Sequence, residues 1–293
     1  MSALTDTIMT TLQQVTGRPH ALRAQVNIGG GCINTTMKLD TSAGPYFLKL
    51  NRAELADMFE AEAAGLAELI EAGAVRVPRP VATGVGGGQA WLVMEYLETG
   101  GRGDMALFGQ QLAAMHRYTA DRFGWKRDNT IGATVQSNAW RESWPEFWRS
   151  RRLEFQLELA RRNGAGARLY EAGMDLAGRL EAFFRDYTPA ASVLHGDLWS
   201  GNYAFLQTGE AVIYDPAVYF GDREADLAMT ELFGGFSPDF YAAYREAWPV
   251  DAGYTVRKVL YNLYHILNHY NLFGGGYAGQ AESMIRQLLS EVR

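Results

Sequence analysis

Three polar residues at a defined spacing form a candidate site for phosphoryl transfer. Asp197 and Asn202 lie within the motif HGDLWSGN, and Asp215 follows thirteen residues after Asn202. Phosphoryl transfer needs a carboxylate that orients and deprotonates a hydroxyl, and oxygen ligands that hold Mg²⁺ on a triphosphate. We therefore predict Asp197 as the catalytic residue, Asn202 and Asp215 as the metal ligands, and ATP with Mg²⁺ as the cofactors.

The motif departs from that of protein kinases at two places. The protein-kinase catalytic loop reads H-R-D-x-x-x-x-N and is followed by D-F-G. In this chain Gly196 stands in place of the arginine, and Asp215-Pro216-Ala217 stands in place of D-F-G. Both changes indicate a kinase of small molecules. The alternative is an ordinary Asp/Asn loop beside a hairpin, and the complete set at this spacing argues against it.

A short hairpin is expected to position the two metal ligands. Residues 203–206 and 211–214 read as strands, and Gly209 lies in the turn between them. Because a hairpin brings its ends together, we expect Asn202 and Asp215 to flank one metal ion.

The remaining sequence indicates two lobes. Helices are expected at 5–16 and 54–72, and apolar runs between turn residues predict strands at 24–28, 35–39, 46–50, 81–85 and 90–96. From Gly103 onward, apolar residues recur mostly at helical spacing. We predict an α+β, protein-kinase-like bilobal fold, with a small β-rich lobe at residues 1–97 and a larger, mainly helical lobe at residues 98–293.

A glycine-rich turn between the first two predicted strands is a candidate phosphate-binding loop. Glycines there would let backbone N–H groups approach phosphates closely. The pattern matches neither a Walker A motif nor G-x-G-x-x-G, so a plain hairpin turn is the alternative. The nucleotide-binding residues predicted in this turn are Gly29, Gly30, Gly31, Cys32 and Asn34.

Lys49 is the candidate phosphate-binding cation. It is flanked by apolar residues on a predicted inner strand, where an unpaired ammonium would be costly to bury. We expect Glu62 to pair with it, in preference to Glu60, because Leu66 and Leu69 follow Glu62 at the spacing of a buried helix face. Such a pair holds the α and β phosphates in kinases. The alternative is a lysine that extends to solvent at a strand edge.

The apolar run at residues 91–97 is expected to lead into the segment that binds adenine. Recognition there would use backbone groups at Glu95 and Leu97, so side-chain identity would matter little. A simple buried strand is compatible with the same residues.

Composition argues against several classes of protein. The 293-residue chain has a net charge of −6 and scattered basic residues, so no nucleic-acid or membrane partner is expected. No apolar run approaches the ~20 residues that span a bilayer, and residues 1–23 lack a signal-peptide core. The single cysteine, Cys32, predicts a cytoplasmic protein without an internal disulfide. Oxidation of Cys32 could still link two otherwise monomeric chains.

Seven motifs together resemble the fructosamine kinase (ketosamine-3-kinase) family, within the superfamily of aminoglycoside phosphotransferases and choline kinases. They are GGGCINTT (29–36), YFLKLN (46–51), MFEAEAAGL (58–66), WLVMEYLE (91–98), LAAMHR (112–117), HGDLWSGN (195–202) and DPAVYFGDREADLAM (215–229). The HGD…N pattern and the later Asp are shared by the whole superfamily. Trp199 and the last motif are diagnostic of the fructosamine kinase branch.

The resemblance implies ATP-dependent phosphorylation of the O3 hydroxyl of a ketosamine, such as ribulosamine or fructosamine, free or bound to protein. The 3-phosphate decomposes and releases the amine, so the implied role is removal of glycation products. Trp199 would lie against the sugar, and His269 is a candidate for the substrate pocket. His195 would support the catalytic loop.

Other polar residues have structural interpretations. His116 reads as a buried structural histidine and Asp226 as a structural anchor. The charged run at residues 222–226 reads as a solvated helix start, where acidic residues are favoured by the helix dipole. His265 and His269 lie one turn apart, but no nearby carboxylate or cysteine supports a metal site.

Two alternative functions stay open at this point. The same fold could phosphorylate another alcohol, of the aminoglycoside, choline or homoserine type, although Trp199 argues against this. A non-catalytic nucleotide-binding protein would be expected to lack some of the residues needed for transfer. Those residues are all present: Lys49, Asp197, Asn202 and Asp215.

Overall fold

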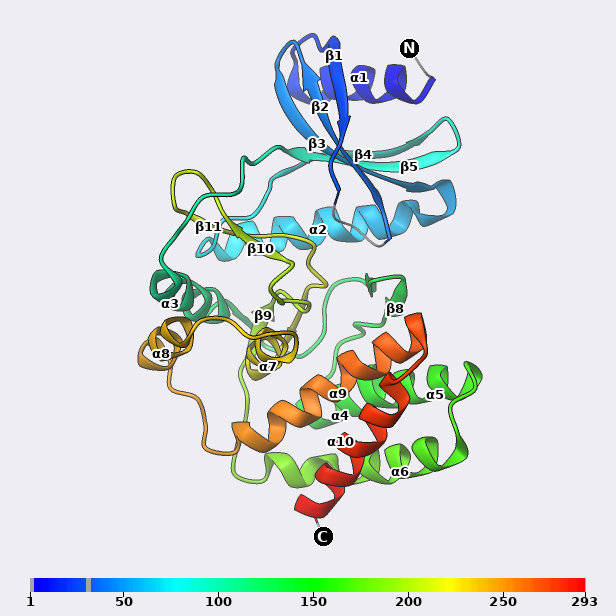
Figure 1. The fold of residues 1–293 in the computed structure, drawn as a ribbon, viewed down its shortest axis with the longest axis vertical. Coiled ribbons are helices and arrows are strands. Elements are labelled where there is room, and N and C mark those ends of the chain that lie inside the picture. The colour runs from blue at the N-terminus through cyan, green and yellow to red at the C-terminus, as the bar shows by residue number, and fades with distance from the viewer. Residues whose placement is uncertain (1–2, 30–32, 293) are drawn as a thin grey trace. The chain divides into compact units, whose positions relative to one another are not determined.

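The computed structural model describes residues 3–29 and 33–292, which form two compact units (Figure 1). The N-terminal unit comprises the chain up to Asp104 together with the later segment Ala204–Asp215. The C-terminal unit comprises Met105–Tyr203 and the chain from Pro216 onward.

A five-stranded antiparallel sheet with strand order β1-β2-β3-β5-β4 forms the N-terminal unit. The strands are β1 (Leu22–Asn27), β2 (Thr35–Thr41), β3 (Gly44–Arg52), β4 (Pro80–Gly86) and β5 (Gln89–Glu95). Helix α1 (Ala3–Thr16) buries Ile8 and Leu12 in one hydrophobic core with Leu48 and Trp91. All five predicted strands are therefore present, with shifted or extended bounds.

Helix α2 (Ala56–Ala72) follows β3 after a 3₁₀ turn at Ala53–Leu55. Its buried face includes Phe59, Leu66 and Leu69, as the apolar spacing predicts. Strand β3 lies between β2 and β5, and its Lys49 is opposite Thr36 and Leu92. The strand thus places Lys49 in the interior of the sheet.

The boundary between the units differs from the predicted division at residue 97. Residues 98–104 stay with the N-terminal unit, as does the hairpin of β10 (Tyr203–Phe205) and β11 (Ala211–Ile213), apart from its first residue. The physical reason is hydrogen bonding: the amides of Gly100 and Gly101 both donate to the Phe205 carbonyl at 3.1 Å. Ile213 donates its amide to the Arg76 carbonyl at 2.9 Å.

The C-terminal unit is mainly helical (Figure 1). Its α-helices are α3 (Met105–His116), α4 (Trp144–Trp148), α5 (Glu154–Arg162), α6 (Ala167–Gly178), α7 (Glu224–Leu232), α8 (Pro238–Ala247), α9 (Tyr254–Phe273) and α10 (Tyr277–Glu291). A π-helical turn at Arg149–Leu153 joins α4 to α5, and a 3₁₀ helix spans Leu180–Phe184.

Two small sheets within this unit were not predicted as strands. The three-stranded sheet has order β12-β9-β6, with β6 (Thr119–Ala120), β9 (Ala191–Leu194) and β12 (Tyr219–Gly221). The other is the hairpin of β7 (Asn129–Ile131) and β8 (Thr134–Gln136). All residues of β9 are buried, and the strand leads directly into His195. The start of the catalytic motif is therefore fixed by a central strand.

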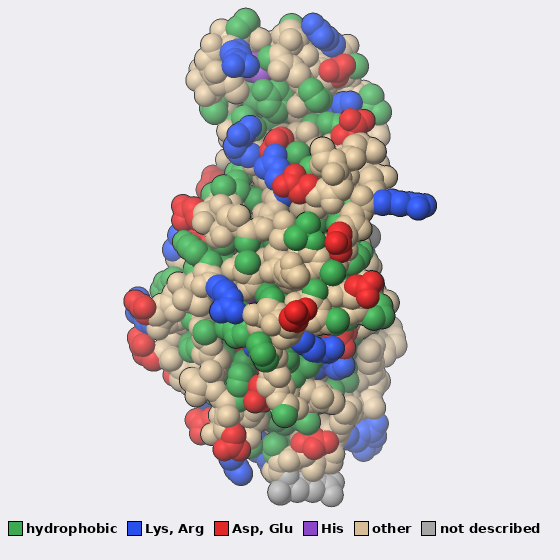
Figure 2. Space-filling model, turned by 90° about the vertical axis from the view of Figure 1, so that its left-hand side faces the viewer, with side chains coloured by type: hydrophobic (Ala, Val, Ile, Leu, Met, Phe, Trp, Pro, Cys, Tyr) green, Lys and Arg blue, Asp and Glu red, His purple; other side chains and the backbone are tan. Residues whose placement is uncertain are grey.

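On the face shown in Figure 2, described Lys and Arg side chains are interspersed with Asp and Glu side chains. None of the described helices has both the length and the hydrophobicity needed to cross a membrane.

Candidate active site

Lys49 is the centre of a buried ionic group in the N-terminal unit. Its Nζ donates to Oε1 of Glu62 at 2.5 Å and to Oδ1 of Asp215 at 2.6 Å. The predicted Lys49–Glu62 pair is thus present, and Asp215 joins it from the end of the β10–β11 hairpin. An ammonium group has three N–H donors, so one donor of Lys49 remains beyond these two contacts.

The electrostatics keep this lysine charged. Burial by itself lowers the pKa of Lys49, but the carboxylates of Asp215 and Glu62 outweigh burial and raise that pKa above its ordinary value. Burial raises the pKa of Glu62, and Lys49 opposes that rise. Lys49 therefore stays protonated at neutral pH, held between two carboxylates.

Asp215 has an unusual backbone conformation. Its φ of 58° is the only positive value found for a non-glycine residue in the described part of the chain. Asp tolerates the left-handed region better than most residues, and such conformations concentrate at functional sites. The Asp215 side chain is 45% exposed although Lys49 binds it. Its carboxylate can therefore also reach an ion from solvent.

The base of the glycine-rich turn is closed by hydrogen bonds. The amide of Ile28 donates to the Thr36 carbonyl at 3.0 Å, and Asn51 in β3 donates to Asn34 Oδ1 at 2.7 Å. Gly29 is exposed, and an added Cβ there would meet no atom within 4 Å. Gly30, Gly31 and Cys32 lie outside the described residues, so their roles in phosphate binding and in a redox link stay predictions.

The contacts of Glu95 limit which of its atoms could bind adenine in the predicted adenine-binding segment. The Glu95 amide donates to the Arg79 carbonyl at 2.8 Å, and its carboxylate pairs with Arg76 at 2.5 Å. Glu95 could then offer adenine only its backbone carbonyl. Leu97 lies two residues beyond the end of β5. Arg76 was not predicted from the sequence, because nothing in its local pattern points to a partner nineteen residues away.

The loop that carries Asp197 is held through its backbone in the C-terminal unit. The amides of His195 and Gly196 donate to the two carboxylate oxygens of Asp226, at 2.7 and 2.8 Å. The Ala217 amide donates to the His195 carbonyl at 2.8 Å. Gly196 has φ 82°, and an added Cβ would lie 2.1 Å from the Ala217 carbonyl oxygen. Glycine is therefore required in place of the arginine of protein kinases.

Asn202 is oriented by the same loop. Its Nδ2 donates to the Asp197 backbone carbonyl at 2.9 Å, and its own amide donates to the Trp199 carbonyl at 2.9 Å. Because the side-chain NH₂ group of Asn202 is hydrogen-bonded within the loop, its Oδ1 atom is the one that can coordinate a metal ion. An amide oxygen and a carboxylate are ligands that Mg²⁺ accepts, with phosphates and water completing its shell.

Asp226 acts as the structural anchor expected from the sequence. Burial alone would raise the pKa of Asp226, but hydrogen bonding and charge from His116, with the backbone donor Gly196, lower it below its ordinary value. His116 is fully buried between Asp226 and Tyr244, with nitrogen–oxygen distances of 3.2 and 2.7 Å. The interpretation of His116 as a structural histidine is confirmed.

Trp199 is held in place by the residues around it. An added Cβ at Gly201 would lie 2.3 Å from Cζ2 of the Trp199 indole, so the indole lies directly over Gly201. The Trp199 ring also packs edge-on against the Phe233 ring, with 6.3 Å between the ring centroids. The Phe233 ring in turn packs against the His269 ring, with 4.9 Å between the ring centroids. The two predicted substrate residues are therefore joined by a phenylalanine that sequence spacing could not identify.

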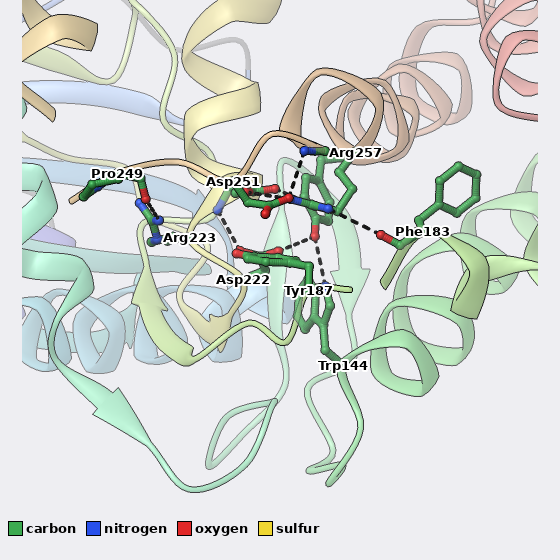
Figure 3. Close-up of polar contacts among 11 residues, drawn as sticks. Trp144, Phe183, Tyr187, Asp222, Arg223, Pro249, Asp251 and Arg257 are labelled. Atoms are coloured by element: carbon green, nitrogen blue, oxygen red, sulfur yellow. Dashed lines mark hydrogen bonds and ion pairs between the residues drawn. The ribbon is translucent and has the colours of Figure 1, made fainter. Parts of the chain in front are cut away.

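The charged run at the start of α7 is buried, and the prediction of a solvated helix start is wrong. Figure 3 draws the polar contacts of Asp222, Arg223 and Arg257. Asp222 and Glu224 have no exposed area, and Arg223 is almost fully covered. Arg257 of α9 donates to both oxygens of Glu224 at 2.8 and 3.0 Å and to Asp251 at 2.7 Å. Arg257, the cation that pairs with Glu224, lies 33 residues away in the sequence.

The remaining hydrogen bonds of this cluster come from tyrosines and backbone carbonyls. Tyr187 and Tyr261 donate to the two oxygens of Asp222 at 2.9 and 2.6 Å. Arg223 donates to the carbonyls of Trp248 and Pro249 at 3.2 and 2.5 Å. Burial raises the pKa of Asp222, and it raises the pKa of Glu224 to about 7 despite Arg257.

The histidine pair on α9 is not arranged around a metal. Within residues 3–29 and 33–292, no group of three or more His, Cys, Asp or Glu side chains is placed to hold an ion. Burial lowers the pKa of His265 to about 3. Nδ1 of His269 lies 2.8 Å from the His265 carbonyl oxygen and donates to it.

Comparison with known proteins gives one consistent family. The sequence model for fructosamine kinase matches residues 4–291. A probable ketoamine kinase of Synechocystis sp. is 47% identical over 288 residues, covering 97% of this chain and 96% of that protein. A chloroplastic protein-ribulosamine 3-kinase of Arabidopsis thaliana is 44% identical over 267 residues, covering 90% of this chain and 82% of that protein.

Solved structures show the same fold. A candidate fructosamine-3-kinase of Thermobifida fusca superposes with a TM-score of 0.86 at 31% identity, covering 97% of this chain and 99% of that one. An aminoglycoside phosphotransferase superposes with a TM-score of 0.59 at 14% identity, covering 95% of this chain and 98% of that one. The predicted α+β, kinase-like fold is confirmed.

Proposed function

The chain belongs to the fructosamine kinase family, and we propose that it is an ATP-dependent kinase that phosphorylates the O3 hydroxyl of ketosamines. The observation that carries this proposal is the buried contact of Lys49 with both Glu62 and Asp215. Kinases use a lysine–glutamate ion pair together with a metal-binding aspartate, and Lys49, Glu62 and Asp215 lie together in this lobe. The left-handed conformation of Asp215 beside the lysine supports a functional role, because such backbone outliers concentrate at functional sites.

Each residue then has a chemical role. The free N–H of Lys49 would bind a phosphate oxygen of ATP, with the 29–34 turn and the backbone at Glu95 and Leu97 binding the rest of the nucleotide. Asp215 and Oδ1 of Asn202 would hold Mg²⁺, which neutralises charge on the phosphates when bound. Asp197 would accept the proton of the sugar hydroxyl.

The substrate side of the proposal rests on the catalytic loop. The indole of Trp199, two residues beyond Asp197, offers an apolar face for a sugar, and His269 lies beyond Phe233. Relatives named for ketoamines and for protein-bound ribulosamine support a ketosamine acceptor. Phosphorylation at O3 would destabilise the adduct and release the amine, which makes the reaction a repair step. The single cysteine of the chain fits a reducing compartment such as the cytoplasm.

The test is ATP consumption against a panel of acceptors: ribulosamine, fructosamine, an aminoglycoside and choline. We expect Mg²⁺-dependent turnover with the two ketosamines, and phosphorus NMR of the product should locate the phosphate on O3. Turnover confined to the aminoglycoside or choline would contradict the proposed acceptor. A mock preparation from host cells that do not express the protein should be assayed in parallel, since turnover in it would expose a contaminating kinase.

The two proposed metal ligands can be ranked by their effect on ATP binding. Asp215→Ala should weaken Mg²⁺-dependent ATP binding more than Asn202→Ala, because a carboxylate contributes more to a hard divalent cation than an amide does. Calorimetric titration of Mg²⁺·ATP into both variants measures the order. Equal affinities would remove the distinction between the two ligands.

A further inference from the structure

A continuous group of aromatic rings extends from the catalytic loop to the end of α9. Beyond the Trp199–Phe233–His269 contacts, the His269 ring lies 5.7 Å from the ring of Phe273 and 5.3 Å from that of Tyr277. We call these five residues the aromatic cluster; they come from the catalytic loop, the end of α7, α9 and the start of α10. The cluster therefore collects rings from elements distant in sequence beside a single loop.

The two ends of the cluster are open to solvent. Trp199 is 37% exposed and Phe273 is 59% exposed, among the few large hydrophobic side chains exposed to this degree. The cluster is thus not part of the closed core of the C-terminal unit, and its ring faces can meet a ligand. Aromatic faces carry negative electrostatic potential and attract organic cations.

His269 adds a directed polar group at the centre of the cluster. Since the His265 carbonyl can only accept, the hydrogen of the neutral His269 ring resides on Nδ1. Nε2 then carries the lone pair and can accept a hydrogen bond from a donor. An acceptor nitrogen surrounded by rings is complementary to a group that is both cationic and an N–H donor.

We infer that the aromatic cluster binds the protonated secondary amine of the ketosamine, with one N–H directed to Nε2 of His269. This inference rests on the proposed function, which supplies the ketosamine. In such a substrate the amine is joined to C1 and is mainly protonated at neutral pH, two carbons from the O3 hydroxyl. Trp199 belongs to the same loop as Asp197. One substrate molecule can therefore place its sugar hydroxyl at Asp197 and its amine at the aromatic cluster. The cluster thereby distinguishes a ketosamine from a plain ketose.

The test compares two acceptors that differ at one group, the protonated amine of 1-deoxy-1-(butylamino)-fructose and the neutral ether oxygen of 1-O-butyl-fructose, which lacks both the positive charge and the N–H donors. The measured quantity is the ratio of kcat/KM for the amine to kcat/KM for the ether. Phe273→Leu keeps apolar area but removes the ring, whereas Phe273→Tyr keeps the ring. We expect the wild type to prefer the amine, Phe273→Leu to reduce that preference about two- to fivefold, and Phe273→Tyr to retain it.

Controls separate the possible failures. Leu107→Ala removes an apolar side chain of similar exposure on α3 and should leave the ratio unchanged. Equal rates for amine and ether in the wild type, or equal losses for both acceptors in Phe273→Leu, would overturn the amine site while leaving the kinase assignment intact. Absence of turnover with either acceptor and with ribulosamine would instead overturn the proposed function, and the amine site with it.

Discussion

At the scale of single residues, the proposed chemistry depends on side chains whose orientation is set by their own loop. Asp197 and Asn202 share the loop, and Nδ2 of Asn202 bonds to the carbonyl of Asp197. Nδ2 of Asn202 also donates to Oδ2 of Asp197 at 3.4 Å, so the two side chains are oriented relative to each other before any ligand binds. Preorganised groups of this kind reduce the reorganisation needed in the transition state.

Asp197→Asn should remove nearly all phosphoryl transfer. An amide cannot accept the hydroxyl proton, and proton abstraction contributes about 10²–10⁴-fold to rate. ATP affinity should change little, because the contacts of Lys49 do not involve this residue. Steady-state kinetics and nucleotide titration measure the two effects. A variant that keeps more than about a tenth of the wild-type kcat would show that Asp197 is not the base.

Gly201→Ala should displace the Trp199 indole. The added Cβ would lie 2.3 Å from the ring, a separation that requires the ring to move. We expect KM for a ketosamine to rise about tenfold, equivalent to ~1.4 kcal/mol, with a smaller change in ATP affinity. Gly279→Ala on α10 is the matched control, since a Cβ there meets nothing within 4 Å. Identical ketosamine KM values for the two variants would mean that the indole does not contact substrate.

At the scale of elements, the catalytic loop follows β9 and is hydrogen-bonded to Ala217 and to the first turn of α7. Asp226 joins the loop to α7 by accepting two backbone amides, and His116 joins α3 to the same carboxylate. One carboxylate therefore sets the position of the loop relative to two helices. A substitution at Asp226 should therefore change the geometry of the catalytic loop as well as the stability of the fold.

Asp226→Asn should impair catalysis while the protein remains folded. The amide NH₂ would face one of the loop amides, leaving a buried donor unpaired at a cost of ~1–3 kcal/mol, and the charge that pairs with His116 is lost. We expect the free energy of unfolding to fall by roughly 3 kcal/mol and kcat to fall more than tenfold. Urea unfolding and kinetics well below the melting temperature check both. Normal kcat in the folded variant would restrict Asp226 to a role in stability.

At the scale of the whole molecule, a buried ionic cluster ties together the C-terminal unit. Arg257 on α9 bonds to Glu224 at the start of α7, to Asp251 before α9 and to the carbonyl of Phe183 (Figure 3). Its guanidinium also lies 3.9 Å above the ring of Tyr187. Since these residues come from four separate segments, the cluster can form only when the unit is folded.

The titration of Glu224 should make stability depend on pH. Its pKa rises from an ordinary 4.5 to about 7 in the folded protein, so the folded state binds the proton more tightly than the unfolded state. This contribution to stability is complete below about pH 4.5 and is lost as the pH rises through about 7. A shift of this size corresponds to about 3 kcal/mol in the free energy of unfolding.

Glu224→Gln removes that titration and provides the measurement. The difference in unfolding free energy between wild type and variant, measured in urea from pH 4.5 to 8, should shift by about 3 kcal/mol in favour of the variant as the pH rises. Glu246→Gln, at an exposed glutamate on α8, is the control for the loss of one negative charge. A curve for Glu224→Gln parallel to that of the wild type would contradict a raised pKa at this residue.

The sequence by itself determined the features that depend on local spacing. The motif HGDLWSGN with Asp215, the five strands of the N-terminal sheet and the pairing of Lys49 with Glu62 all follow from short-range patterns. Strand alternation and helix periodicity are properties of neighbouring residues, so they can be read without knowledge of the fold. The family motifs are equally local and gave the kinase-like fold correctly.

The tertiary structure alone decided which distant residues meet. It buried the charged run at 222–226, because Arg257 and Tyr261 reach it from α9. The β10–β11 hairpin belongs to the N-terminal unit through hydrogen bonds to residues 98–101, and Phe233 lies beside His269, which is thirty-six residues away in the chain. No spacing rule encodes such contacts, since the partners lie far apart in the chain and their pairing depends on how whole elements pack.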